Sequence, residues 1–349
     1  MNETKLMFSL GELKYFINKA LGLSYEKNSI TGFELIVPLM EATAYNGYVE
    51  NISNNKRQIL YLRTKESLIS MMRHAYLDYI KRISEKFELC KKKVILAFDY
   101  TDEDFYGDVQ GLDIHGWTGK DGVTGHFKFL TCSIISDEIP QKIPLISTPI
   151  RIGHYKSHEI LYCLSLIKDY IGKIKLILFD KSFLNNELMY DLSKIKYPYL
   201  IFVPRREEYK KFFEELDNGL TLFVHDYEIN RDKTNYNGET YLAFLKQIYD
   251  SKLEKNLDWI FAKNVETIAL GKIIKTYKKR WRIETQFRVH DEARIRCKSS
   301  EMKIRYFLFL FEQMLQTIWI CFYKDECSFK EFIIAMAKMS RKWTKTKEA

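Results

Sequence analysis

The chain has 349 residues, of which 46% are apolar and 15% aromatic; this composition excludes a disordered protein and allows two or three domains with their own cores. The six cysteines form no CxxC pair, and the N-terminus lacks the basic start and long apolar stretch of a signal peptide, so a secreted disulfide scaffold is not expected. The formal net charge of +9 is modest, and its distribution along the chain is more informative than its size.

Residues 1–90 are predicted to be helical. Leu10, Leu13 and Ile17 recur at helical spacing, and Glu66 to Phe87 forms a longer amphipathic stretch. No helix-turn-helix signature stands out in this region. From the sequence alone it could be a module for packing, for oligomerisation or for DNA binding.

Residues 91–204 are predicted to alternate between strands and helices. The expected order is a strand at 94–98, a strand at 126–135, a helix at 158–171, a strand at 174–179, a helix at 185–195 and a strand at 199–203. Strands interleaved with helices of this length indicate an α/β sheet with a parallel portion.

Residues 205–265 are predicted to form a β-rich insertion, because apolar or alternating runs at 220–225, 241–249 and 259–262 are separated by polar turns. The alternative is that these are ordinary extra strands of the main sheet. Residues 266–325 are expected to be helices that close the main domain, followed by a basic C-terminal tail at 326–349.

The most apolar window of the chain is Tyr306 to Tyr323. It contains Glu312, Gln313 and Gln316, whereas a spanning helix needs about 20 predominantly apolar residues. We therefore expect a buried helix that packs on the main domain, and no membrane partner.

Three carboxylates occupy distinct local patterns. Asp99 follows the apolar run Val94–Phe98, Asp180 follows the run Ile174–Phe179, and Glu284 lies in a basic helical stretch. Two strand ends and one helix can bring together acids that are far apart in sequence. Magnesium and manganese prefer oxygen ligands, and a pair of such ions supports both the attacking and the leaving oxygen of a phosphodiester displacement. The three acids are therefore predicted to be catalytic and to bind two divalent metal ions, Mg²⁺ or Mn²⁺.

A single Asp after a strand is usually a turn or cap residue, so the prediction rests on all three acids together. Other acids compete with Asp99, and Asp102 is the reserve; the competitors are Asp102, Glu103, Asp104 and Asp108. Asp99 is preferred because it alone ends the apolar run. His154 and His158 are four residues apart, but no third ligand completes a zinc set, so structural roles are expected for them.

Positive charge is concentrated between Gly271 and Arg305, where twelve Lys or Arg residues stand against four Asp or Glu. Binding to a polyanion is the natural interpretation, and a solvated helix face is the alternative. The candidate DNA-binding residues in this stretch are Tyr277, Arg280, Trp281, Arg288, Arg294 and Lys298. Two of them have plainer alternatives: a surface salt bridge between Arg280 and Glu284, and a core position for Trp281.

The segment Asp99–Gly107 and the pattern Tyr277-x-x-Arg280-x-x-x-Glu284 resemble the signature regions of insertion-sequence DDE transposases of the YREK type, and the resemblance covers roughly residues 90–310. It implies a ribonuclease H-like mixed sheet flanked by helices, with a helical N-terminal domain that binds DNA ends and a β-rich insertion. The chain departs from the pattern at Asp291, seven residues past Glu284, where the family usually has Lys. That departure leaves the role of the lysine unassigned.

The resemblance also implies a function and partners. The protein is expected to cleave at the ends of a mobile element and to transfer the 3′-hydroxyls to target DNA. Its partners would be double-stranded DNA, as terminal inverted repeats and as target, and further copies of the chain in a homodimer or higher oligomer. It would act in the prokaryotic cytoplasm, at the nucleoid. The alternatives are a structure-specific nuclease without strand transfer and a catalytically silent DNA-binding descendant.

Overall fold

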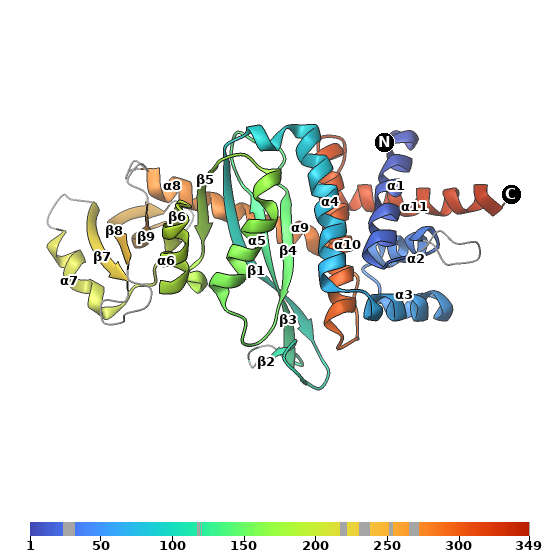
Figure 1. Cartoon of the computed structure of the whole chain (residues 1–349), viewed down its shortest axis with the longest axis horizontal. Helices are drawn as coiled ribbons and strands as arrows, with labels where there is room; N and C mark the ends of the chain where they lie inside the picture. The colour runs from blue at the N-terminus through green and yellow to red at the C-terminus, as the bar shows by residue number, and fades with distance from the viewer. Residues whose placement is uncertain are drawn as a thin grey trace.

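The structure is a computed structural model that describes residues 1–23, 32–116, 119, 121–216, 222–229, 238–250, 254–264 and 272–348. Figure 1 shows an elongated molecule with strands from residues 222–263 at one end, a mixed sheet in the middle and helices from both termini at the other end. Parts of the expected insertion, including 220–221, and the start of the expected closing helices at 266–271 lie outside the described residues.

Helices make up the N-terminal region, as the apolar spacing predicts. They are α1 (Glu3–Ala20), α2 (Gly32–Ala44), the short η1 (Val49–Asn51), α3 (Asn54–Glu66) and α4 (Ile69–Phe87). Helix α1 begins at Asn2, whose side-chain oxygen accepts a hydrogen bond from the Thr4 backbone N–H at 2.8 Å.

The stretch that we expected to be a basic tail forms α11 (Phe329–Glu348), which packs against α1 and α2 (Figure 1). Its apolar residues Phe332, Ile333 and Met336 are fully buried, while its basic residues gather toward the C-terminus. Because this stretch is rich in lysine we expected a basic tail, but it forms an amphipathic helix.

Among the described residues, nine strands form one mixed sheet: β1 (Val94–Phe105), β2 (His115–Gly116), β3 (Gly125–Ile134), β4 (Pro144–Ile150), β5 (Ile174–Phe179), β6 (Tyr199–Phe202), β7 (Leu222–Ile229), β8 (Gly238–Asp250) and β9 (Lys255–Lys263). Their order is β2-β3-β1-β5-β6-β9-β8-β7, and β4 also pairs with β3. Strands β1, β5 and β6 are parallel, whereas β3 runs antiparallel to β1.

Strand β4 is not predicted by the sequence pattern, because Pro144 and Pro149 interrupt its apolar run. In the part of the chain that the structure describes, β4 pairs with β3 alone and so lies at an edge. Proline lacks the N–H that an inner strand needs, and edge strands tolerate it.

The insertion continues the main sheet. Strand β9 pairs antiparallel with β6, and β8 and β7 follow outward, with the short helix α7 (Lys210–Glu215) beside them. The strands of the insertion are therefore also strands of the main sheet. This is the alternative that we considered for them.

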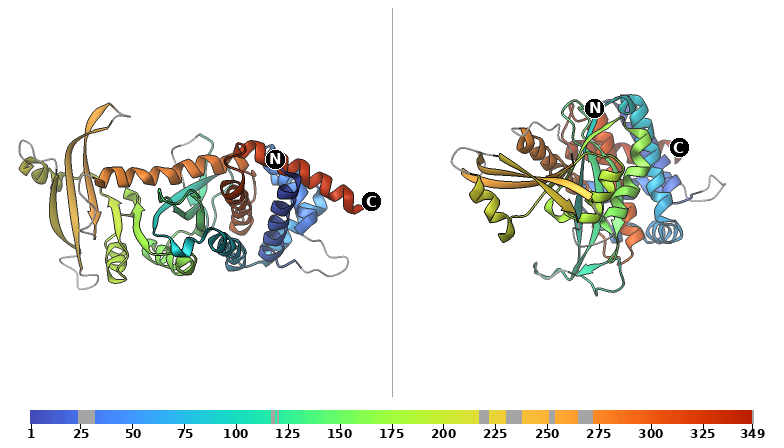
Figure 2. Two further views of the ribbon diagram at one scale, coloured as in Figure 1. Left: turned by 90° about the horizontal axis from the view of Figure 1, so that it is seen from above. Right: turned by 60° about the vertical axis from the view of Figure 1, so that its left-hand side comes forward.

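The two faces of the sheet have separate cores. Phe98 and Phe179 belong to the larger core, together with residues of α4, α5 (Lys156–Ile167), α6 (Asn186–Lys194) and α10 (Met302–Phe322). Their neighbours in sequence, Ala97 and Leu178, belong to the smaller core on the other face, with residues of α8 (Ile273–Tyr277) and α9 (Trp281–His290). Helix α8, the short η7 (Lys278–Arg280) and α9 follow one another as one nearly straight rod along one side of the sheet (Figure 2, left).

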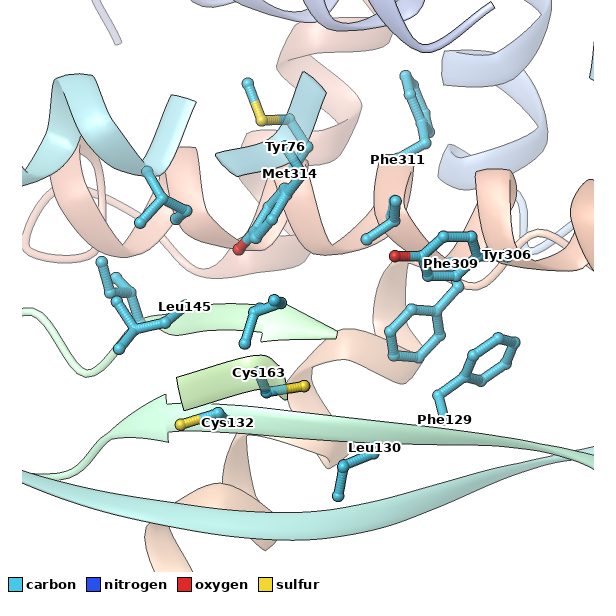
Figure 3. Packing of buried hydrophobic residues seen from close by; sticks show 14 of the residues in the cluster. Tyr76, Phe129, Leu130, Cys132, Leu145, Cys163, Tyr306, Phe309, Phe311 and Met314 are labelled. Carbon is cyan, nitrogen blue, oxygen red and sulfur yellow. The ribbon is translucent and has the colours of Figure 1, made fainter. Parts of the chain in front are cut away.

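Helix α10 is the buried helix expected at 306–323. Figure 3 shows its Tyr306, Phe309 and Met314 packed between strands β3 and β4 and the Tyr76 ring of α4. The rings of Phe309 and Phe129 stack with their centres 4.4 Å apart. Within the described residues, no helix combines the length and the apolar character needed to cross a membrane.

Candidate active site

Asp99 and Asp180 lie side by side because of the strand register. In the parallel pair β1 and β5, Phe98 is paired with Phe179, and this is the last pair of the ladder. Asp99 is the next residue of β1 and Asp180 is the first residue after β5, and neighbouring strands are about 4.8 Å apart. The sequence prediction placed Asp99 at a strand end, but β1 continues to Phe105; the apolar run ends at Asp99 because its partner β5 ends there.

Arg280 joins Asp99 to Glu284. Its Nη1 donates to Asp99 Oδ2 at 2.8 Å, and its Nη2 donates to Glu284 Oε1 at 2.5 Å. The Arg280 side chain is only 7% exposed, so the salt bridge with Glu284 is not the weak surface pair that we considered. One buried guanidinium thus connects a strand acid and a helix acid that are 185 residues apart (284 − 99).

Burial raises the pKa of Asp99 to about 6, although the Arg280 charge and the Tyr100 backbone N–H both act to lower it. The nearby charges of Asp180 and Glu284 raise it further. Asp180 and Glu284 therefore both lie within electrostatic reach of Asp99. A site with this excess of negative charge stabilises any cation that enters it.

Helix α9 is fixed to the sheet on the side of Glu284. Lys279 and Arg282 both form ion pairs with Asp137, which follows β3, and Arg282 Nη1 also donates to the Ile135 carbonyl at 2.6 Å. These bonds hold the start of α9 against the end of β3. Glu284 remains 45% exposed and can turn toward a ligand.

The donor atoms of the three acids suit a hard divalent cation. They are carboxylate oxygens in a partly buried, negatively charged site, which is what Mg²⁺ and Mn²⁺ prefer. Among the described residues, no three acidic, histidine or cysteine side chains are close enough to form a complete ligand set. Arg280 lies between Asp99 and Glu284 and supplies the positive charge there.

One of the residues predicted to touch DNA, Tyr277, lies differently from expectation. Tyr277 is 3% exposed and packs on the insertion, with its ring centre 4.9 Å from that of Phe261. Trp281 is half-buried. The Lys278 amine lies 5.8 Å from the centre of the Trp281 ring.

The remaining predicted cations differ in availability. Arg288 is exposed on α9, one turn past Glu284. Arg294 forms an ion pair at 3.6 Å with Asp291, the acid at the position where the resembling transposases usually have Lys. Lys298 is exposed.

Arg296 is an exposed cation that sequence reasoning missed. The run Arg294-Ile-Arg-Cys-Lys298 alternates basic and apolar residues, and Ile295 and Cys297 are buried while Arg296 and Lys298 are exposed. This period of two is the signal of an extended segment, and it could have identified Arg296.

The reserve acid and the histidine pair lie apart from the three acids. Asp102 is three residues from Asp99 on β1, so its side chain points to the opposite face of the strand. Its Oδ1 lies 3.8 Å from His126 Nε2 and 3.9 Å from Lys128 Nζ. His154 precedes α5 and contacts Glu159, whereas His158 lies within α5 and contacts Glu187. The two histidines do not share a ligand, as expected for structural roles.

Comparison with known proteins gives a match to a family model over part of the chain and a similar fold. Residues 150–315 match the family model of the transposase DDE domain, a range that includes Asp180 and Glu284 and begins after Asp99. A cryo-EM structure of the piggyBac transposase synaptic complex with hairpin DNA is similar, with a TM-score of 0.54 and 12% sequence identity over 98% of this chain and 81% of that chain. No curated protein sequence matches the chain. At this identity the likeness shows the fold, and the expected ribonuclease H-like mixed sheet flanked by helices is confirmed.

Proposed function

We propose that this protein is a DDE-type DNA transposase of an insertion sequence, which hydrolyses a phosphodiester at each element end and joins the freed 3′-hydroxyls to target DNA. The observation that carries the proposal is the grouping of Asp99, Asp180 and Glu284 around one buried arginine. The match of residues 150–315 to a transposase domain supports it independently of that geometry.

Asp99 and Asp180 would be the rigid ligands of the site, since both are fixed by the sheet, and Asp99 is the candidate for the ligand shared by two ions. Glu284 would complete the site from α9. When bound, two Mg²⁺ or Mn²⁺ ions would neutralise charge on the phosphate and lower the pKa of the attacking water or 3′-hydroxyl. Phosphoryl transfer depends mainly on such positioning and neutralisation.

Arg280 would hold the acids in place before the ions arrive, and its planar fork suits a phosphate oxygen once they are engaged. Exposed or half-buried positions support direct DNA contacts by Trp281, Arg288 and Lys298. The burial of Tyr277 supports an indirect role, in which its ring positions Arg280; the guanidinium carbon lies 5.7 Å from the ring centre.

The proposed partners are double-stranded DNA, as terminal inverted repeats and as target, and at least one further copy of the chain, because two ends have to be cut together. Incubation of the purified protein with labelled element ends and Mg²⁺ tests the activity. Nicking together with joining supports a transposase. Nicking alone indicates a nuclease, and a shifted band without cleavage indicates a silent DNA-binding descendant.

Single replacements test the assignment of the acids. Asp99→Ala, Asp180→Ala and Glu284→Ala should each abolish cleavage while binding to the labelled ends remains. Asp102→Ala is the matched control, since it removes an acid from the same strand at a position facing His126 and Lys128, and it should keep cleavage. An acid that proves dispensable loses its assignment.

A further inference from the structure

A second charged region lies farther along β1, where a pocket of about 590 Å³ opens between the end of this strand, the segment 294–298 and the loop before η1. Its lining includes Glu103 of β1, Arg296 and Lys298 of the segment, and Tyr48 of the N-terminal region. Glu103 and Asp104, which follow one another on β1, both line the pocket.

The segment 294–298 is held in an extended form by bonds on both sides. Arg296 forms a parallel bridge with Tyr48, in which the Val49 N–H donates to the Arg296 carbonyl at 2.8 Å and the Arg296 N–H donates to the Gly47 carbonyl at 2.9 Å. On the inner side, the buried Glu312 of α10 accepts a hydrogen bond from the Ile295 N–H at 2.7 Å. The backbone of Arg296 therefore fixes the segment, and its side chain is left to face the pocket.

Two cations flank the Tyr48 ring. The guanidinium carbon of Arg296 lies 5.7 Å from the ring centre and the Lys298 amine lies 5.4 Å from it. Both side chains are exposed, and neither forms an ion pair with another residue in the described ranges. The other two cations of the pocket are already paired, Arg294 with Asp291 and Arg305 with Glu103.

We propose that this pocket binds the phosphodiester backbone of duplex DNA, with Arg296 and Lys298 as the phosphate contacts and Tyr48 as the contribution of the N-terminal region. The inference rests on the proposed function, because it takes DNA as the ligand. Arginine and lysine release counterions when they neutralise phosphates, and tyrosine hydroxyls commonly donate to phosphate oxygens. The pocket therefore offers three groups suited to one stretch of backbone.

The spacing along β1 gives the distance between the pocket and the candidate active site. Glu103 is four residues beyond Asp99 on an extended strand, which is about 13 Å at roughly 3.3 Å per residue. A duplex that ran along β1 would cover this distance in roughly four base pairs. The N-terminal region and the catalytic sheet would then hold the same DNA segment.

The test measures binding of the full-length protein to a fluorescein-labelled 40-base-pair duplex by anisotropy, in KCl from 50 to 200 mM. The variant Arg296→Ala/Lys298→Ala should bind about tenfold more weakly, and the slope of log affinity against log salt should fall by about 2 in magnitude. Arg296→Lys/Lys298→Arg should keep both values. Lys175→Ala/Lys194→Ala removes two exposed cations from β5 and α6, outside the pocket lining, and should leave the slope unchanged.

Wild-type affinity and slope in Arg296→Ala/Lys298→Ala, with an unchanged circular dichroism spectrum, would overturn the inference, as would a wild-type protein that does not bind the duplex. A protein that binds in the predicted manner but never cleaves element ends would overturn the proposed function and leave this site standing. If the wild-type protein cleaved element ends but the double variant kept full affinity, only the inferred phosphate-binding site would be rejected.

Discussion

Strand β1 passes two charged regions whose cations are used differently. At Asp99 the nearest cation, Arg280, is buried and bonded to two acids. At Glu103 a second buried cation, Arg305, forms a similar pair, but Arg296 and Lys298 remain exposed beyond it. A count of charges gives one basic stretch from Gly271 to Arg305, whereas the structure divides it into cations that neutralise the protein's own acids and cations that are available to a ligand.

The replacement Arg305→Ala should have the largest effect on stability. Arg305 is 2% exposed, and it donates to Glu103 at 2.6 Å and to the carbonyls of Cys297 and Ser299 at 2.7 Å each. Its loss leaves a mostly buried carboxylate and two carbonyls without their partner, at a cost of about 4 kcal/mol in the free energy of unfolding. Urea unfolding measures this cost. A change below about 1 kcal/mol would show that Arg305 contributes as little to stability as an exposed cation.

The replacement Arg280→Ala should cost about 3 kcal/mol in the presence of EDTA, because it leaves Asp99 without its counter-charge. Addition of Mg²⁺ should restore part of this loss, since a divalent cation that binds the folded protein stabilises it. The wild-type protein, measured in parallel with and without Mg²⁺, is the reference. If Mg²⁺ stabilised both proteins equally, the ion would not replace the Arg280 charge beside Asp99.

The titration of Asp99 gives a pH dependence that distinguishes the two regions. Because burial raises its pKa from 3.8 to about 6, the folded state binds the proton more tightly than the unfolded state does. Stability is therefore present in full below about pH 4 and is lost as the pH rises through 6, by roughly 2 to 3 kcal/mol in EDTA. Asp99→Asn should remove this component from unfolding curves measured between pH 4 and 7, and an unchanged profile would contradict the assignment.

The replacement Arg296→Ala should have the smallest effect, less than about 0.5 kcal/mol on unfolding, because the side chain is exposed and the backbone makes the structural bonds. The matched experiment is Arg305→Ala in the same pocket. If Arg296→Ala proves as destabilising as Arg305→Ala, then Arg296 belongs to the fold, and the contrast between buried and available cations fails.

The two aspartates could be found from the sequence because a polar residue that ends an apolar run marks the point where the neighbouring strand stops. The partner of Arg280 could not be found in the same way. Its bond to Glu284 follows from helical spacing, but Asp99 lies 181 residues away in sequence, and only the packing of α9 on the sheet brings them together.

Burial was the other quantity that local patterns did not give. Tyr277 shares a helix face with Arg280 and was expected to contact DNA, but the insertion covers it with Trp259 and Phe261. The lysines of the C-terminal stretch likewise concealed the apolar face of α11. In each case the partner that decides exposure comes from a distant part of the chain.

The junction of β9 with β6 has a mechanical consequence. The rod that carries Glu284 begins beside the insertion, where Tyr277 lies against Phe261 of β9, whereas Asp99 belongs to the inner strand β1 and Asp180 directly follows the inner strand β5. A force that shifts the outer strands would therefore move the N-terminal end of this rod and change the distance of Glu284 from Asp99 and Asp180. Shortening the insertion as far as β9 would remove the support under Glu284 without altering any of the three acids.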